Sequence, residues 1–203
     1  MLTRFVTALG RAPKSQADMD GKQHKWLFLL PHEDDPDNGF SLSDDLDPPL
    51  GAAAANDLTV VAQYMTGAEY VPEIILSSRT RRARDMVDFI AAKLNREPVL
   101  WTERAIHYGA TAEMIDSLRA VKDSVKAVLV ITGARRLAHL ALKLSRGYGP
   151  YTARAARHRM LADFPAGSFA ALCLATERWS DLAPKAGLVH AFVRPSDLRP
   201  KDH

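Results

Sequence analysis

The sequence has little cysteine and no long apolar run. Its 203 residues include one cysteine, Cys173, which cannot form an intrachain disulfide, so the chain is not a small secreted scaffold held by disulfides. Cys173 lies in the apolar run FAALCLA, and this position predicts a buried, unreactive thiol. No apolar run reaches the roughly 18 residues needed to cross a bilayer. We therefore expect a soluble, cytoplasmic protein without a membrane partner.

Motifs that bind metals and cofactors are also missing. No glycine-rich phosphate loop or dinucleotide fingerprint follows an apolar strand pattern, and the histidines and the cysteine lack zinc spacing. The acidic run at 35–39 places its glycine at the fifth position of a would-be calcium loop, whereas an EF-hand needs glycine at the sixth. The sequence thus predicts no cofactor and no metal.

Aromatic residues are scarce, at 7% of the chain, and most of them lie in apolar runs of strand length. The sequence pI of about 9.1 would suit a polyanion. Without a surface of aromatic side chains for base stacking, however, the sequence does not favour nucleic acid as a partner. The net charge of +3 is unevenly distributed, because residues 33–47 contain seven acids and neither Lys nor Arg. The rest of the chain is therefore markedly basic.

The residues that are present predict one domain of alternating strands and helices. We assign residues 1–24 to an N-terminal extension and residues 25–203 to the domain, since the length suits a single core. Apolar runs predict strands at 25–30, 74–76, 99–101, 127–131, 168–174 and 188–193. Helical patterns lie at 53–65, 112–121 and 136–144, and a further helix, capped by Ser77 and Ser78, ends near Leu94. This alternation favours an α/β fold, a three-layer α/β/α sandwich with a mostly parallel central sheet.

Ligands of such sheets bind beyond the carboxyl ends of the strands. Here four segments follow those ends: His32, residues 77–84, His107 with Tyr108, and residues 132–136. These segments are where we expect the functional site.

Seven segments in order carry a resemblance to a known family. They read LFLLPH, DPPLG, EIILSSRTRRARDM, HYGATAEMI, AVLVITGARRLAHLA, DFPAGSFAAL and LVHAFVRPSDL. From Trp26 to Leu198 the chain resembles the histidine phosphatase superfamily, with its phosphoglycerate mutase-like fold, and is most similar to SixA-type phosphohistidine phosphatases. The resemblance implies a phosphate pocket of two arginines and two histidines, in which one histidine attacks phosphorus and becomes a phosphohistidine. A neutral imidazole is a nucleophile near pH 7, and the cations stabilise charge on the phosphoryl oxygens.

Two members of that implied pocket are present and two are not. His32 falls on the nucleophile position and Arg82 on a phosphate-binding position. Pro31 stands where the resemblance implies an arginine, and proline has no side-chain donor. Gly133 stands where it implies the second histidine. Both departures remove a cation from the pocket.

Three nearby side chains are candidates to replace the lost cations. Arg135 and Arg136 begin a predicted helix, where free N–H groups already favour anions, and His107 is predicted to lie with Tyr108 on the loop after the third strand. The alternative for each is an ordinary solvated side chain. The acids at 33–35 follow His32 directly, and their carboxylates would repel a phosphate.

Since one preorganised donor is worth roughly 10²–10³ in rate, the loss of two predicts little or no turnover. Our hypothesis is a catalytically impaired SixA-like protein, a pseudoenzyme that acts as a binding or regulatory module. The partner that this hypothesis favours is a phosphorylated or charged protein rather than a small phosphate ester. The alternative is an active phosphohistidine or phosphomonoester phosphatase with His32 as nucleophile.

Overall fold

The computed structural model describes residues 24–34, 48–94 and 97–200. The N-terminal extension and the acidic residues 35–47, including the calcium-loop register, lie outside the described residues, except for His24. Among the described helices, none is long and apolar enough to cross a membrane.

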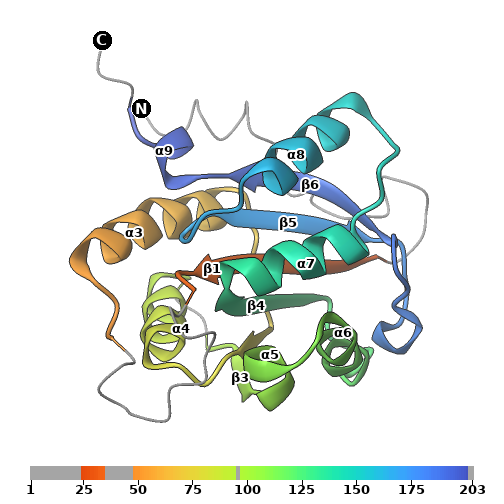
Figure 1. The fold of residues 1–203 in the computed structure, drawn as a ribbon, viewed down its shortest axis with the longest axis horizontal. Helices are drawn as coiled ribbons and strands as arrows, with labels where there is room; N and C mark the ends of the chain where they lie inside the picture. The colour runs from red at the N-terminus through yellow and green to blue at the C-terminus, as the bar shows by residue number, and fades with distance from the viewer. Residues whose placement is uncertain (1–23, 35–47, 95–96, 201–203) are drawn as a thin grey trace.

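Six strands form one sheet (Figure 1). They are β1 (Lys25–His32), β2 (Ile74–Ser77), β3 (Val99–Thr102), β4 (Ala127–Gly133), β5 (Phe169–Leu174) and β6 (Gly187–Val193). Their order across the sheet is β3-β2-β4-β1-β5-β6. β1 to β4 run parallel to one another, and β5 runs antiparallel to both of its neighbours. The predicted mostly parallel sheet is therefore confirmed.

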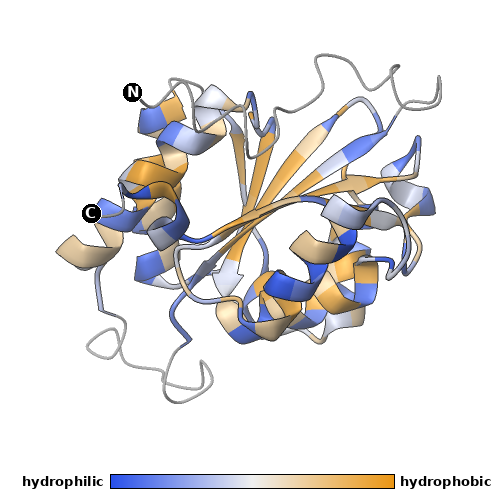
Figure 2. Cartoon of the chain, turned by 90° about the horizontal axis from the view of Figure 1, so that it is seen from above, coloured by the Kyte–Doolittle hydropathy of each residue, from blue (hydrophilic) through white to orange (hydrophobic). Residues whose placement is uncertain are grey.

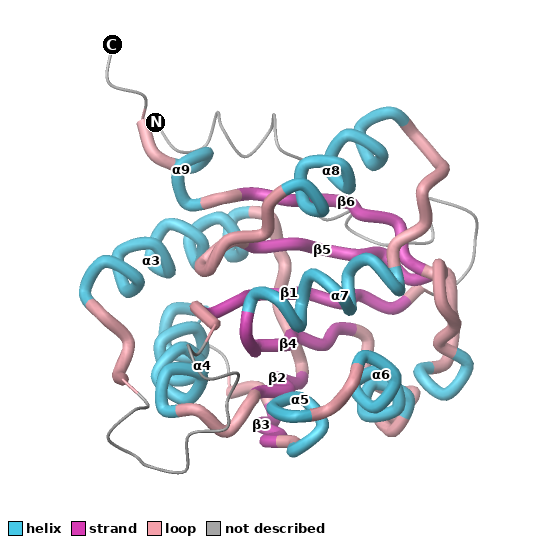
Figure 3. The backbone as a smooth tube through the Cα atoms, viewed as in Figure 1, coloured by secondary structure: helices cyan, strands magenta, loops and turns pink. Residues whose placement is uncertain are grey.

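Helices connect the strands and cover the sheet (Figure 3). They are α3 (Ala52–Gly67), α4 (Arg81–Leu94), α5 (Arg104–Tyr108), α6 (Thr111–Arg119), α7 (Ala134–Leu144), α8 (Tyr151–Ala162) and α9 (Pro195–Leu198), with a 3₁₀ turn, η2 (Trp179–Asp181). The patterned helices appear within a few residues of their predicted ends. α5 differs from the prediction, because the sequence predicts a loop at His107 and Tyr108, where the structure has a helix.

Each face of the sheet has its own apolar core. Alternate residues of β1 point to opposite faces, so Leu29 belongs to the core under α6, α7 and α8, whereas Leu30 belongs to the core under α3 and α4. The apolar strands lie between the two helical layers (Figure 2). Cys173 is buried on β5. This arrangement is the predicted three-layer sandwich.

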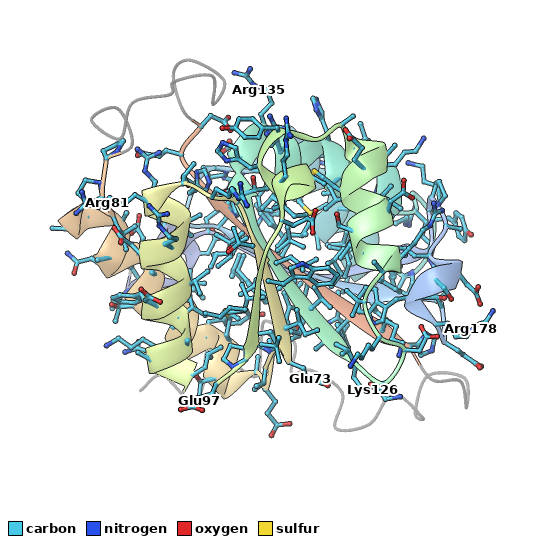
Figure 4. The ribbon with its side chains drawn as sticks, turned by 90° about the horizontal axis from the view of Figure 1, so that it is seen from below. Glu73, Arg81, Glu97, Lys126, Arg135 and Arg178 are labelled. Atoms are coloured by element: carbon cyan, nitrogen blue, oxygen red, sulfur yellow. The ribbon has the colours of Figure 1, made fainter. Side chains whose placement is uncertain are left out.

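The register between β1 and β4 positions the candidate site. Pro31 lies beside Thr132, and His32 lies beside Gly133, at the carboxyl ends of the two parallel strands. α4 and α7 begin at this same edge, where Arg81 and Arg135 point outward, while Glu73, Glu97 and Lys126 lie at the opposite edge (Figure 4). Two motif positions that are about a hundred residues apart in sequence thus become neighbours.

Candidate functional site

His32 ends β1 and is 4% exposed. Its Nδ1 lies 2.6 Å from the carbonyl oxygen of Glu33, and its Nε2 lies 3.2 Å from the hydroxyl of Ser78. Because a carbonyl oxygen only accepts, Nδ1 carries the proton, and in the neutral ring Nε2 keeps its lone pair and accepts from Ser78. The nitrogen that a nucleophile needs is therefore unprotonated and is turned toward the start of α4.

Arg82 is the buried member of an arginine-rich segment. It is 9% exposed, whereas Arg79, Arg81 and Arg84 are exposed. Its Nη1 donates to the carbonyl oxygen of Glu33 at 2.9 Å, and its Nη2 lies 3.9 Å from the Glu33 carboxylate. One carbonyl group thus contacts both His32 and Arg82 and holds the two side chains on the same side of the sheet.

The start of α4 orients these groups. Thr80 Oγ1 accepts from the backbone N–H of Ala83 at 3.1 Å, which is an N-cap contact, and lies 3.3 Å from the Ser78 hydroxyl. The sequence predicts this cap at Ser77 and Ser78. The assignment is wrong, since the helix begins at Arg81 and Ser78 contacts His32 instead.

Asp34 occupies the N-terminus of α7. Both of its carboxylate oxygens accept from the backbone N–H of Arg135, at 3.1 and 3.2 Å. A Cβ atom placed on Gly133 would lie 2.5 Å from Asp34 Oδ1, so a side chain at position 133 would displace the carboxylate. Free N–H groups and the helix dipole make this end of a helix attractive to anions. The anion bound at this helix end is the Asp34 carboxylate of the same chain.

Pro31, which stands where the resemblance implies an arginine, continues β1 without disturbing the strand. Its pairing with Thr132 continues the β1–β4 register, while pairing with β5 stops at Leu29. Its missing N–H therefore leaves no ladder hydrogen bond unmade. Its carbonyl oxygen accepts from the N–H of Gly167 at 2.8 Å, which fixes the loop before β5 next to the site.

The three candidate substitutes lie around the site in different roles. Arg136 donates from Nη1 to the carbonyl oxygen of Gly109 at 2.7 Å, so its guanidinium joins α7 to the segment between α5 and α6. Arg135 has an exposed side chain, and its backbone binds Asp34. His107 is 9% exposed on α5, with its ring 3.8 Å from that of Tyr108. Its predicted place on a surface loop is wrong, because Thr132 Oγ1 donates to Ile106 and ties this helix to β4.

The sequence places Ser78 and Asp34 beside the site but does not predict their partners. The Ser78 hydroxyl looks like a helix cap in sequence, whereas it contacts His32. The partner of Asp34 is about a hundred residues away, so no local signal identifies it. Among the described residues, no group of three His, Cys, Asp or Glu side chains lies close enough together to hold a metal ion.

Solved structures share this arrangement of strands, helices and connections. A protein assigned as phosphohistidine phosphatase SixA from Nakamurella multipartitia superposes with a TM-score of 0.68 and 23% identity, over 86% of this chain and 98% of that one. The fold is that of the histidine phosphatases. The protein histidine phosphatase SixA complexed with tungstate gives a TM-score of 0.65 at 20% identity, covering 86% of this chain and 99% of its own. A SixA protein from Agrobacterium tumefaciens gives 0.57 at 16% identity, with 73% of this chain and 90% of that chain covered.

No protein-family model matches the chain, and no curated protein matches its sequence. At these identities the shared property is the histidine phosphatase fold. What the site does has to be argued from its own residues.

Proposed function

We propose that this protein is a catalytically impaired member of the histidine phosphatase fold, which binds a phosphorylated or otherwise anionic segment of a partner protein without hydrolysing it. The observation that carries the proposal is the position of Asp34. Its carboxylate holds the N-terminus of α7 beside Gly133, next to His32 in the β1–β4 register. A phosphate entering there meets a resident negative charge, which raises the free energy of the bound anion.

The remaining donors of the site support the same proposal. Glu33 binds Arg82 through its carbonyl oxygen, and its carboxylate lies nearby. Arg136 donates to Gly109, and Pro31 offers no donor. Phosphoryl transfer depends on cations that are already aimed at the equatorial oxygens. In this site the one retained arginine is engaged by the chain's own backbone.

One observation favours the alternative function, an active phosphatase. The tautomer that the Glu33 carbonyl imposes on His32 leaves Nε2 with a lone pair, as a nucleophile requires. Ser78 is the group that lies against this nitrogen, and rotation of its hydroxyl would release the lone pair. The two functions therefore differ in the phosphate clamp and share the nucleophile.

Turnover decides between them. We expect no hydrolysis of a phosphohistidine protein or an aryl phosphate by the wild type above the level of His32→Ala. His158→Ala is the matched control, because His158 is exposed on α8, away from the candidate site residues. Hydrolysis by the wild type and by His158→Ala that disappears in His32→Ala would establish the active phosphatase and overturn the proposal.

Binding is measured separately, with tungstate as the first probe, because a SixA structure of this fold is complexed with it. We expect titration calorimetry to detect tungstate or a phosphopeptide bound by the wild type, and to detect weaker binding by Arg82→Ala. Binding that Arg82→Ala leaves unchanged would contradict the role given to this pocket. We place this activity in the cytoplasm, since the one cysteine suits a reducing compartment.

A further inference from the structure

A groove of about 860 Å³ lies on the outer side of α6 and α7. Its apolar lining includes Ile115 and Leu142, and Pro184 with Lys185 stands at the end where both helices finish. Ala110 and Thr111 line the other end, next to Gly109, whose carbonyl binds Arg136. Leu142 is 47% exposed. The groove thus extends along α6 and α7 from the segment that Arg136 contacts, and these two helices belong to the layer in front of the sheet in Figures 1 and 3.

The charge around this groove has one dominant sign. Between Asp123 and Asp163 the chain contains eight Lys or Arg residues and no acid, and this stretch includes both α7 and α8. Within the described part of the chain, neither Lys143 nor Arg154 belongs to an ion pair. On α8, Arg159 pairs with Asp197. The stretch as a whole stays cationic, and it attracts anions over a Debye length of about 8–10 Å.

Backbone carbonyls hold two of the cations that line the groove. Arg119 donates from Nε and Nη2 to the carbonyl oxygen of Leu182, and Lys185 donates from Nζ to that of Leu142. Asp116 is the one acid among the lining residues, and it pairs with Arg119. Arg119 is thus neutralised by Asp116, whereas the carbonyl contact leaves the charge of Lys185 unneutralised, so Lys185 and Lys143 give the groove its cationic lining. Such preorganisation lowers the entropic cost of binding.

We propose that this groove binds an acidic amphipathic segment of a partner protein. The cations select a negatively charged occupant, and the exposed apolar side chain of Leu142 selects one that also carries aliphatic side chains, while Ile115 lines the groove as a buried core residue. A helix with apolar residues at positions i, i+3, i+4 and i+7 and acids on either side satisfies both conditions. RNA satisfies only the first, since it has no aliphatic groups to fill the groove. This binding does not require turnover or phosphate binding at His32.

The test uses three probes of equal charge on the full-length protein. The first is a fluorescein-labelled helical peptide of about 18 residues, with leucines on one face and glutamates beside them. The second is the same composition in scrambled order, which keeps the charge and loses the apolar face. The third is a single-stranded RNA. We expect anisotropy to show the patterned peptide binding at least about tenfold more tightly than either of the others.

Two substitutions in the groove and one outside it locate the binding. Leu142→Glu is expected to weaken binding of the patterned peptide about tenfold or more, and Lys143→Glu several-fold, with a smaller salt dependence. Lys93→Glu is the matched control, because Lys93 is exposed at the end of α4 on the other side of the sheet. Circular dichroism and Tm verify that each variant is folded.

Any of three results overturns the proposal. These are no binding of the patterned peptide, equal binding of the scrambled peptide or the RNA, and equal loss of binding in Lys93→Glu and Leu142→Glu. Tungstate binding and turnover are measured on the same samples. If the peptide does not bind in the groove but Arg82→Ala still weakens tungstate binding, the groove proposal fails and the proposed function stands. If the peptide binds but Arg82→Ala has no effect on tungstate binding, the groove proposal stands and the proposed function fails.

Discussion

At the scale of single residues, Asp34 and Gly133 form one structural unit. The glycine lacks the atom that would lie 2.5 Å from Asp34 Oδ1, and the carboxylate fills that space and caps α7. The backbone of Gly133, with φ −57° and ψ 146°, suits any residue. The requirement for glycine here is therefore one of space and not of conformation. A side chain at this position and the Asp34 carboxylate in its present place compete for the same space.

This coupling predicts non-additive stability. Asp34→Ala is expected to cost about 1 kcal/mol of unfolding free energy, because it removes the anion from the helix N-terminus. Gly133→Ala is expected to cost about the same, because its Cβ displaces the same carboxylate. The double variant is then expected to cost about 1 kcal/mol as well, which urea unfolding of the four proteins measures.

Asp34→Asn is the control for the charge, since asparagine keeps the acceptor and caps helices about as well as aspartate. Costs that add to about 2 kcal/mol in the double variant would show that the two residues act independently. That result would also remove the physical link between glycine at position 133 and the Asp34 cap.

The sequence predicts the retained residues of this site better than its acquired contacts. His32 and Arg82 occupy positions that strand ends and motif spacing define in advance. Asp34 binds α7 through a contact between distant segments, and its acidic neighbours look like a solvated loop in sequence. Ser78 has two possible partners, a helix end and the His32 ring. Only the strand order, in which β4 alone separates β2 from β1, determines which one it contacts.

At the scale of elements, α4 connects the apolar core to the site. Its buried face, with Met86, Val87 and Ile90, belongs to the core, while its first turn carries Arg82. The predicted length of this helix follows from that apolar spacing. Its start does not, because three hydroxyl residues precede it, and each of them can cap a helix.

Removal of the Thr80 cap is expected to loosen the first turn. Thr80→Ala loses the contact with the Ala83 N–H and is predicted to lower the unfolding free energy by about 1 kcal/mol. Tungstate binding is expected to weaken as well, since Arg82 belongs to that turn. Thr80→Ser retains the hydroxyl and should behave like the wild type in both measurements. Equal losses in the serine and alanine variants would place the effect in the methyl group and not in the cap.

Physical reasons explain why the sequence predicts two elements, α5 and β5, less well than the others. α5 has five residues, which is too short for an apolar period to be recognised. β5 is one buried apolar run and is antiparallel to its neighbours. A strand buried on both faces shows no alternation, so its sequence carries no mark of its direction.

At the scale of the whole molecule, the uneven charge of the sequence is divided between two places. Glu33 and Asp34, the first acids of the acidic segment, bind groups at the carboxyl edge of the sheet. The acid-free stretch forms α7 and α8, which cover one face. The sequence alone predicts the first place, because the acids follow His32 directly. The second depends on α7 and α8 lying side by side over the same core, which only the fold determines.

The stability of the whole molecule in acid is expected to depend on His190. Its Nδ1 lies 2.8 Å from the Tyr70 hydroxyl, within hydrogen-bond distance, and its ring lies edge-on to Trp26. Burial lowers the pKa of His190 below its ordinary value of 6.5. The folded state therefore keeps the ring neutral where the unfolded chain binds a proton, so stability is lost as pH falls from about 6.5 through the lowered pKa.

His190→Gln retains an acceptor for Tyr70 and removes the titration. We expect the unfolding free energy in urea to fall less between pH 7.5 and pH 5 in this variant than in the wild type. His158→Gln, at an exposed position on α8, is expected to follow the wild type. Carboxylates contribute equally to all three proteins, so the difference isolates the buried ring. The same loss in wild type and His190→Gln would mean that proton uptake at this ring does not limit stability in acid, and that the acid limit is set by paired carboxylates such as Asp181, whose pKa its hydrogen bond to Arg178 lowers.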